Sequence, residues 1–376
     1  MKRKLKTAFV STYPPRECGI ATFTEDIIRE LKKMDDVEVG IVALNDDAYR
    51  YPEDVVHVLE QQEKEAYLHA AKYLNKSPYQ VVMVEHEYGI FGGADGAYLL
   101  DFVDALKKPA VATLHTVLPS PSSSQKEILK TLCEKSEAVV LMSENSMEVL
   151  HDVYEVPREK MIMIHHGVPN IELRSKKELR KAQEIEEGAV ISTFGLLAPG
   201  KGLEYGIEAM AEVVKKHPKA RYYVIGKTHP VIQREQGESY RHSLERLART
   251  LGIAENIRFI NAYLEKQEIM EWLKLSDIYL TPYLGKDQAV SGTLAYAVGS
   301  GTVIVSTPYR YAEEMLAENR GILADFNSAE SLADAITFLL DNEETRKRME
   351  CNTKRLGGTM TWDQVAKQYK DVLISL

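Results

Sequence analysis

Two series of short apolar runs, each alternating with segments of helical spacing, constrain the fold of this chain more than any other feature. The first series covers residues 7–11, 37–43, 81–85, 110–113, 138–142 and 161–164, and the second covers residues 190–194, 221–225, 257–260, 278–281, 303–306 and 322–324. Continuous apolar runs are typical of strands that are buried on both faces of a parallel sheet. The alternation predicts right-handed βαβ units, and hence an α/β fold with two doubly wound, Rossmann-like sheets.

The two series are separated by residues 171–188, which are highly charged and carry no strand signal. We therefore predict an N-terminal domain of residues 1–170 and a C-terminal domain of residues 171–358, which face each other across a cleft. In the first series, helical spacing covers residues 24–33, 63–74, 97–106 and 125–136, the last with Ser124 as a candidate N-cap. Because open α/β sheets bind ligands at the carboxyl ends of their strands, the residues directly after each strand are the functional candidates.

Composition narrows the class of protein. Hydrophobic residues make up 44 % and charged residues 27 % of the 376 residues, as in ordinary soluble globular proteins, and the net charge of −9 argues against a general nucleic-acid surface. No apolar run reaches the roughly 18 residues of a membrane helix, and the basic N-terminus lacks the apolar region of a signal peptide. The three distant cysteines, Cys18, Cys133 and Cys351, indicate reduced thiols. We therefore expect a cytoplasmic protein.

Peripheral membrane contact is left open by one basic helix. Lys126, Lys130 and Lys135 share the predicted helix 125–136. A basic amphipathic face would suggest docking on a membrane, and the alternative is an ordinary solvated face.

Polar residues follow three strands of the first series. Gly19 stands just before a helix, where it could let a phosphate approach free N–H groups; a plain strand–helix turn is the alternative. His86 and Glu87 are interpreted as a polar wall, the alternative being a capped turn with one buried histidine. A metal site is not favoured there, since no H-E-x-x-H pattern is present. His115 suits hydrogen bonding or acid–base work, unless a backbone partner satisfies it.

In the second series, the turn of residues 195–202 joins a strand to a helix. Gly195, Lys201 and Gly202 combine flexible backbone, one cation and a helix N-terminus, which together predict an anion site, although the spacing is not that of a P-loop. The alternative is a surface lysine in a flexible turn.

A second candidate anion site begins the Ala-rich helix after residue 290. The hydroxyls and N–H groups of Ser291, Gly292 and Thr293 converge there, which suits a diphosphate. Farther along, Glu313 and Glu314 lie in the next helix, where one of them could bind ribose hydroxyls with its carboxylate while the other faces solvent.

Taken together, these features resemble the retaining glycosyltransferases of family 4, which have the two-Rossmann-domain glycosyltransferase-B fold. The resemblance covers nearly the whole chain. It implies that the C-terminal helix, residues 359–376, returns to the N-terminal domain, where Trp362 would pin the crossing. The residues that carry the resemblance are Gly19, His115, Gly195, Lys201, Gly202, residues 291–306 and Glu314.

The chain departs from the family pattern at two places. Leu196 stands where family members usually have an arginine, and Lys286 and Leu294 stand where they usually have two glutamates. The nearest acid, Asp287, is one residue away. Lys201 is then expected to carry the diphosphate contact with help from Arg241 or Lys286, ribose recognition falls to Glu314, and the positions around the missing glutamates are taken by Gln288, Ser291 and Thr293.

The resemblance implies transfer of a neutral hexose, mannose or glucose, from a nucleotide diphosphate sugar to a carbohydrate or lipid-linked acceptor, with retention and with GDP-mannose favoured as donor. No metal or other cofactor is implied, since Lys201 and helix N-termini would stabilise the leaving diphosphate. His115 and Asp287 are the predicted catalytic groups, with His115 acting on a donor-sugar hydroxyl or on the oxocarbenium-like transition state. His86 and Glu87 would line the acceptor and sugar side.

Two other functions remain open at this stage. One is a nucleotide-sugar epimerase of the same fold, which would cleave the sugar–phosphate bond without an acceptor. The other is a non-catalytic sugar-binding partner subunit, which the missing glutamates would explain.

Overall fold

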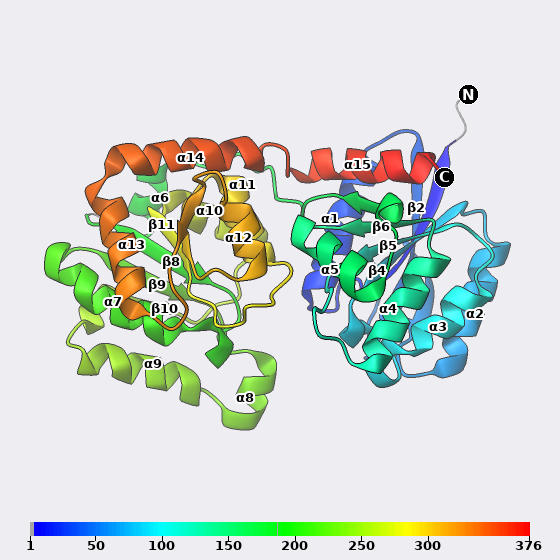
Figure 1. The fold of residues 1–376 in the computed structure, drawn as a ribbon, viewed down its shortest axis with the longest axis horizontal. Helices are drawn as coiled ribbons and strands as arrows, with labels where there is room; N and C mark the ends of the chain where they lie inside the picture. Colours follow the sequence, from blue (N-terminus) through cyan, green and yellow to red (C-terminus); the bar gives the residue numbers. More distant parts are fainter. Residues whose placement is uncertain (1–3, 186) are drawn as a thin grey trace. The chain divides into compact units, whose positions relative to one another are not determined.

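The computed structural model describes residues 4–185 and 187–376 and divides into two compact units (Figure 1). One unit contains Met1–Gly167 together with Trp362–Leu376, and the other contains Val168–Thr361. These divisions lie a few residues from the domain boundaries expected at 170 and 358.

The first unit is built on a seven-stranded parallel sheet with the order β3-β2-β1-β4-β5-β6-β7. Six of these strands coincide with the predicted apolar runs, whereas β3 was not predicted. The bounds are β1 (Leu5–Ser11), β2 (Val37–Asn45), β3 (Val55–Glu60), β4 (Val81–His86), β5 (Ala110–Leu114), β6 (Ala138–Leu141) and β7 (Met161–Met163).

Helices cover this sheet, and side-chain caps set where two of them begin. The Sγ atom of Cys18 accepts a hydrogen bond from the Ala21 N–H, so the first helix begins at Gly19, before the predicted residue 24. Ser122, rather than Ser124, caps the fourth helix in a reciprocal capping box with Gln125. The helices are α1 (Gly19–Lys32), α2 (Lys64–Lys76), α3 (Tyr98–Ala105), α4 (Ser123–Lys135), α5 (Glu144–Tyr154) and α15 (Trp362–Ile374), with 3₁₀ turns η1 (Tyr88–Ile90), η2 (Ala94–Gly96) and η3 (Arg158–Lys160).

The last helix, α15, packs within the first unit against α1 (Figure 1). The indole of Trp362 is buried, and its ring centroid lies 5.1 Å from that of Phe23. A Cβ atom at Gly167 would overlap with this indole, so only glycine fits there. About two turns after Trp362, the Tyr369 hydroxyl lies 3.2 Å from the Thr113 hydroxyl of β5.

The second unit is built on a six-stranded parallel sheet with the order β10-β9-β8-β11-β12-β13. Alternate residues of β11 pack into two separate apolar clusters, which shows that this strand is buried on both faces. The strands are β8 (Val190–Phe194), β9 (Arg221–Ile225), β10 (Ile257–Ile260), β11 (Ile278–Thr281), β12 (Val303–Ser306) and β13 (Gly321–Leu323). The helices are α6 (Lys176–Ala182), α7 (Leu203–Lys216), α8 (Pro230–Gln236), α9 (Ser239–Thr250), α10 (Lys266–Leu275), α11 (Gly292–Ser300), α12 (Arg310–Leu316), α13 (Ala329–Asp341) and α14 (Glu343–Gly357), with turns η4 (Pro199–Lys201) and η5 (Ala254–Asn256).

The prediction of two Rossmann-like parallel sheets is therefore confirmed. In each sheet the strand order reverses at one point, between β1 and β4 in the first unit and between β8 and β11 in the second. Ligands of such folds bind outside the carboxyl ends of the strands at this switch point. The segments that follow these four strands are therefore the first place to look for a site.

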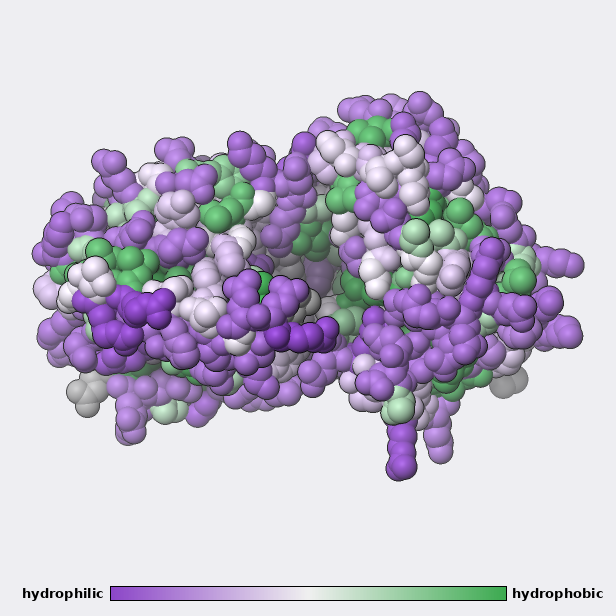
Figure 2. Space-filling model, turned by 90° about the horizontal axis from the view of Figure 1, so that it is seen from below, coloured by the Kyte–Doolittle hydropathy of each residue, from purple (hydrophilic) through white to green (hydrophobic). Residues whose placement is uncertain are grey.

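The surface gives no sign of a membrane span. None of the helices within residues 4–185 and 187–376 is long and apolar enough to cross a bilayer, and hydrophilic side chains predominate on the face that Figure 2 draws. Two of the three lysines of α4 form ion pairs, Lys130 with Glu155 at 2.6 Å and Lys135 with Asp104 at 2.8 Å.

Candidate functional site

The turn that follows β8 is held rigidly against the segment that follows β11. Gly195 has a φ of +133° and Gly202 a φ of +60°, and both values favour glycine. A Cβ atom at Gly202 would overlap with the carbonyl oxygen of Pro282, and the Leu284 N–H donates to the Gly200 carbonyl at 3.0 Å. The turn and the segment after β11 therefore form one structure at the switch point of the second sheet.

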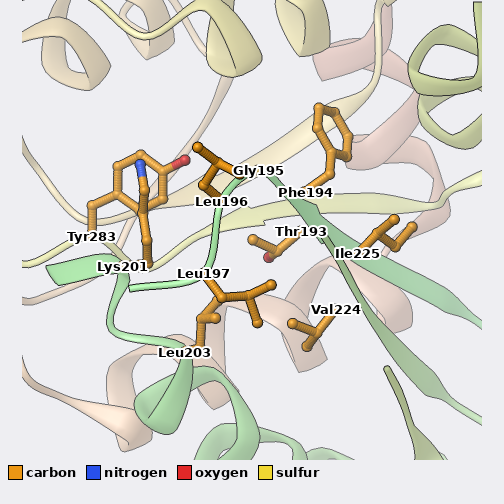
Figure 3. Close-up of a pocket in the computed structure, with 10 residues that line it drawn as sticks. All are labelled: Thr193, Phe194, Gly195, Leu196, Leu197, Lys201, Leu203, Val224, Ile225 and Tyr283. Carbon is orange, nitrogen blue, oxygen red and sulfur yellow. The ribbon is translucent and has the colours of Figure 1, made fainter. Parts of the chain in front are cut away.

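Lys201, at the end of this turn, lies over an aromatic ring. Its Nζ atom is 3.8 Å from the ring centroid of Tyr283, and Figure 3 shows the two side chains together. The Tyr283 ring is 2 % exposed and stacks on Tyr309, with centroids 5.4 Å apart and planes 18° apart. Lys201 and Tyr283 line a pocket of about 220 Å³, including open solvent, whose other lining residues are Thr193, Phe194, Gly195, Leu196, Leu197, Leu203, Val224 and Ile225.

The same tyrosine touches the start of α11. Ser291 caps this helix by accepting the Leu294 N–H, and its hydroxyl lies 3.2 Å from that of Thr293. The Tyr283 hydroxyl lies 3.4 Å from the Thr293 hydroxyl. The first turn of α11, which begins at Gly292, holds no acidic residue. Tyr283 thus contacts both elements for which the sequence predicts an anion site, the Lys201 turn and the N-terminus of α11.

The Arg241 side chain is buried and hydrogen-bonded within the second unit. It is 4 % exposed, and its guanidinium donates to Glu238 at 2.9 Å, to the Gly226 carbonyl at 2.7 Å and to the Asn261 side chain at 3.0 Å. These bonds tie together the segments that follow β9 and β10. These contacts show a structural role for Arg241, and its assistance to Lys201 stays a prediction.

The segment before α11 packs on the start of α12. The Asp287 side chain is 63 % exposed and forms an ion pair with Arg310 at 3.2 Å, while Gln288 donates to the Val290 carbonyl. A catalytic role for Asp287 stays a prediction. Glu314 lies half-buried on α12, close enough to Tyr311 to contribute to the raised pKa of that phenol, whose main cause is burial.

In the first unit, the start of α1 has room for a side chain at Gly19. Gly19 is the first residue of this helix, and a Cβ atom there would meet no described atom within 4 Å. The first turn holds no acidic residue. A phosphate site at this helix end stays a prediction, and one of its N–H groups, that of Ala21, already donates to the Cys18 Sγ atom.

The residues after β4 form a capped turn with one buried histidine, and the polar wall stays a prediction. His86 is 1 % exposed between Tyr88 and Phe91, and burial, with a contribution from His115, lowers its pKa to about 3. Glu87 caps η1 through the Tyr88 N–H at 3.0 Å and accepts the Thr116 hydroxyl. Both side chains are thus engaged within the unit.

His115 has a carboxylate partner rather than a backbone one. Its Nε2 atom lies 2.9 Å from Oε2 of Glu85, and the edge of the Phe23 ring packs against it with centroids 4.8 Å apart. Glu85 was missed in the sequence because it stands inside an apolar strand. An acid within a continuous apolar run is itself an anomaly, and it is the signal that could have identified this residue.

No group of three or more His, Cys, Asp or Glu side chains within residues 4–185 and 187–376 is arranged to hold a metal ion. The three cysteines are free thiols.

Comparisons with known proteins place these features in a family. Residues 18–170 match the model of Glycosyltransferase Family 4, and residues 175–356 match that of Glycosyl transferases group 1. The D-inositol 3-phosphate glycosyltransferase of Corynebacterium glutamicum (strain R) is 25 % identical over 287 residues, which cover 70 % of this chain and 66 % of that protein. The matched region spans about two thirds or less of the length of the curated relatives.

Solved structures agree on the fold. Anabaena Alr3699/HepE, in complex with UDP and glucose, superposes with a TM-score of 0.78 at 16 % identity, covering 99 % of this chain and 100 % of that one. Sucrose-phosphate synthase from Thermosynechococcus elongatus gives 0.79 at 14 % identity, covering 99 % of both chains. With two family models that together cover most of its length, the chain belongs to the family 4, group 1 glycosyltransferases of the glycosyltransferase-B fold.

Proposed function

We propose that the protein transfers a neutral hexose from a nucleotide diphosphate sugar to a carbohydrate or lipid-linked acceptor, with retention at the anomeric carbon. The observation that carries this proposal is the convergence of Lys201 and the N-terminus of α11 on Tyr283, at the switch point of the second sheet. Cationic and N–H groups at such a point suit a diphosphate.

Stabilising the leaving group is the main chemical demand on this site. Negative charge develops on the diphosphate as the sugar–phosphate bond breaks, and preorganised positive groups lower the barrier. Lys201 supplies the charge, and the hydroxyls of Ser291 and Thr293 with the N–H groups of α11 supply hydrogen bonds. In this proposal these groups act without a metal ion.

The sugar would be recognised by the first unit through His115. A neutral hexose suits hydrogen-bonding groups without a fixed positive charge. The chain resembles proteins whose structures hold UDP and glucose, so we propose a uridine or guanosine diphosphate hexose as donor and test UDP-glucose and GDP-mannose side by side.

Replacing Lys201 tests the donor site. Lys201→Ala should weaken donor binding and turnover by about 10- to 150-fold, because a charge-assisted hydrogen bond contributes ~1.5–3 kcal/mol. Lys216→Ala, which removes an exposed lysine from the far end of α7, is the matched control and should leave both unchanged.

Products distinguish the proposed reaction from its rivals. Mass spectrometry of reactions with each donor, with and without acceptor sugars, should show a hexose added to the acceptor. An epimerised sugar formed without acceptor would indicate an epimerase. Tight donor binding without turnover of any donor would indicate a sugar-binding subunit, and equal donor kinetics in Lys201→Ala would remove this lysine from the site.

A further inference from the structure

A carboxylate buried in the sheet of the first unit lies against His115. Glu85 is 0 % exposed near the end of β4, and it stands beside Thr113 in the register of β4 and β5. Its Oε2 atom is 2.9 Å from Nε2 of His115, which follows β5 directly. The His115 backbone N–H donates to the His86 carbonyl at 3.0 Å, which fixes the two strand ends relative to each other.

This carboxylate is costly for stability. Moving an ionised carboxylate out of water costs several kcal/mol, and burial raises the pKa of Glu85 despite the hydrogen bond from His115. Its second oxygen, Oε1, is buried and makes no hydrogen bond of normal geometry among the described residues, although the Thr113 hydroxyl faces the same carboxyl. Perturbed, paired groups of this kind concentrate at functional sites.

The contact determines which atom of His115 can meet a substrate. Glu85 engages Nε2, and the Phe23 ring packs edge-on against the imidazole at an interplanar angle of 89°, so the ring is restrained in plane and direction. An ionised Glu85 holds the proton on Nε2, and Nδ1 is left as the nitrogen for a ligand.

The other ionisable groups close to His115 and Glu85 are neutral near pH 7. His86 and His166 lie close to His115, and burial lowers their pKa values to about 3 and about 4, so both are neutral near pH 7. Tyr369 on α15 lies close to Glu85, and its pKa is raised by burial, so it is neutral as well. These three neighbours therefore add no charge beside Glu85 near pH 7.

We propose that Glu85 is a positioning residue for glycosyl transfer: its buried carboxylate fixes the proton and the orientation of His115 so that Nδ1 is presented to the sugar. The inference rests on the proposed function, since it needs His115 to act on the donor sugar. Glu85 itself touches no substrate.

A double-mutant cycle tests this proposal, with turnover and donor KM measured for the full chain and the donor that it uses. Glu85→Gln should lower kcat by roughly 10- to 100-fold and change the donor KM by less than about 3-fold, because an orienting partner acts in the transition state rather than in binding. If Glu85 acts only through His115, the double variant Glu85→Gln/His115→Ala should be no more than about 3-fold slower than His115→Ala alone.

The pH profile adds a readout that a purely structural role would not move. The kcat of the natural enzyme should fall as the pH falls through the raised pKa of Glu85, since the protonated carboxyl no longer accepts the Nε2 proton. Glu85→Gln should lack this limb. Glu85→Asp keeps the charge but shortens the side chain, so it should also lose kcat, and it replaces Glu85→Gln if that variant does not fold.

Three outcomes would overturn the inference while the natural enzyme is active: full kcat in Glu85→Gln, additive losses in the double variant, or an acidic limb that persists without the carboxylate. An inactive natural enzyme with every donor would instead contradict the proposed function.

Discussion

The ammonium nitrogen of Lys201 lies 3.8 Å from the centroid of the Tyr283 ring, and the Tyr283 hydroxyl reaches Thr293 in the first turn of α11. A buried ring that is stacked on Tyr309 cannot turn away, so it fixes the position of the cation. Lysine over an aromatic face gains about 0.5–1 kcal/mol at exposed sites and about 2 kcal/mol when it is desolvated. The Tyr283 ring therefore holds the Lys201 ammonium group in position in the absence of a donor.

Removing this ring should weaken donor binding. Tyr283→Leu should raise the Kd of a nucleoside diphosphate by about 5- to 30-fold, which corresponds to about 1–2 kcal/mol of lost preorganisation. Tyr283→Phe keeps the aromatic face and is the matched control, with an expected change of less than about 3-fold. Isothermal titration calorimetry measures both. Equal affinities for the Leu and Phe variants would show that the ring does not position Lys201.

The glycines of the turn after β8 should differ sharply in their tolerance of a side chain. Gly202→Ala places a Cβ atom against the Pro282 carbonyl at a left-handed φ, so it should cost about 2–4 kcal/mol of unfolding free energy. Gly200→Ala meets no described atom within 4 Å and should change stability by less than about 1 kcal/mol. Chemical denaturation decides the matter, and equal stability of the two variants would contradict the close packing of this turn.

The sequence predicted the sheets because their strands are continuous apolar runs, which only burial on both faces explains. It did not predict β3, since this strand lies at the edge of the sheet and five of its six residues are only partly buried or exposed, among them Val58. It placed the start of α1 too late because a cysteine thiol, Cys18, caps the helix instead of an oxygen side chain. The first miss follows from the place of β3 in the sheet, and the second from an unusual local cap.

For the site, the sequence identified Lys201 and the residues at the start of α11, since glycines, hydroxyls and cations at strand ends are local signals. Tyr283 and Glu85 stand in or directly after buried strands, where they look like core residues, and only the fold shows what they touch. The sequence suggested that Arg241 was free to bind a diphosphate. Its burial depends on contacts with residues of other segments, such as Asn261, which the sequence does not show.

An ion-pair cluster at the start of the second unit should make stability depend on acid. Burial raises the pKa of Asp277, but the carboxylate accepts hydrogen bonds from Lys176 at 2.8 Å and Arg180 at 2.6 Å. These two cations outweigh the effect of burial and hold the pKa below the ordinary 3.8. A depressed carboxyl pKa contributes stability that is present above the unfolded value and lost as the pH falls through the folded one.

Asp277→Asn should therefore cost about 1–3 kcal/mol at pH 7, and the difference from the natural protein should shrink as the pH falls below about 4. Asp334→Asn, at an exposed position of α13, is the control and should change little. A deficit that stays constant between pH 7 and pH 3 would mean that Asp277 does not stabilise through its charge.

His86 should also make the first unit sensitive to acid, in a higher pH range. Burial lowers its pKa to about 3 in the folded chain, against 6.5 for an ordinary histidine. Below pH 6.5 the unfolded chain therefore binds a proton that the folded chain refuses, and stability falls as the pH drops from 6.5 towards 3. At pH 5 this single group should lower the free energy of unfolding by about 2 kcal/mol relative to pH 8.

His86→Leu removes the titrating group. Its loss of unfolding free energy between pH 8 and pH 5 should therefore be smaller than that of the natural protein by about 2 kcal/mol, whatever its stability at pH 8. His69→Gln, which changes an exposed histidine of α2, should keep the full loss. If urea denaturation at the two pH values gives His86→Leu the same loss as the natural protein, His86 is not the neutral core residue described here.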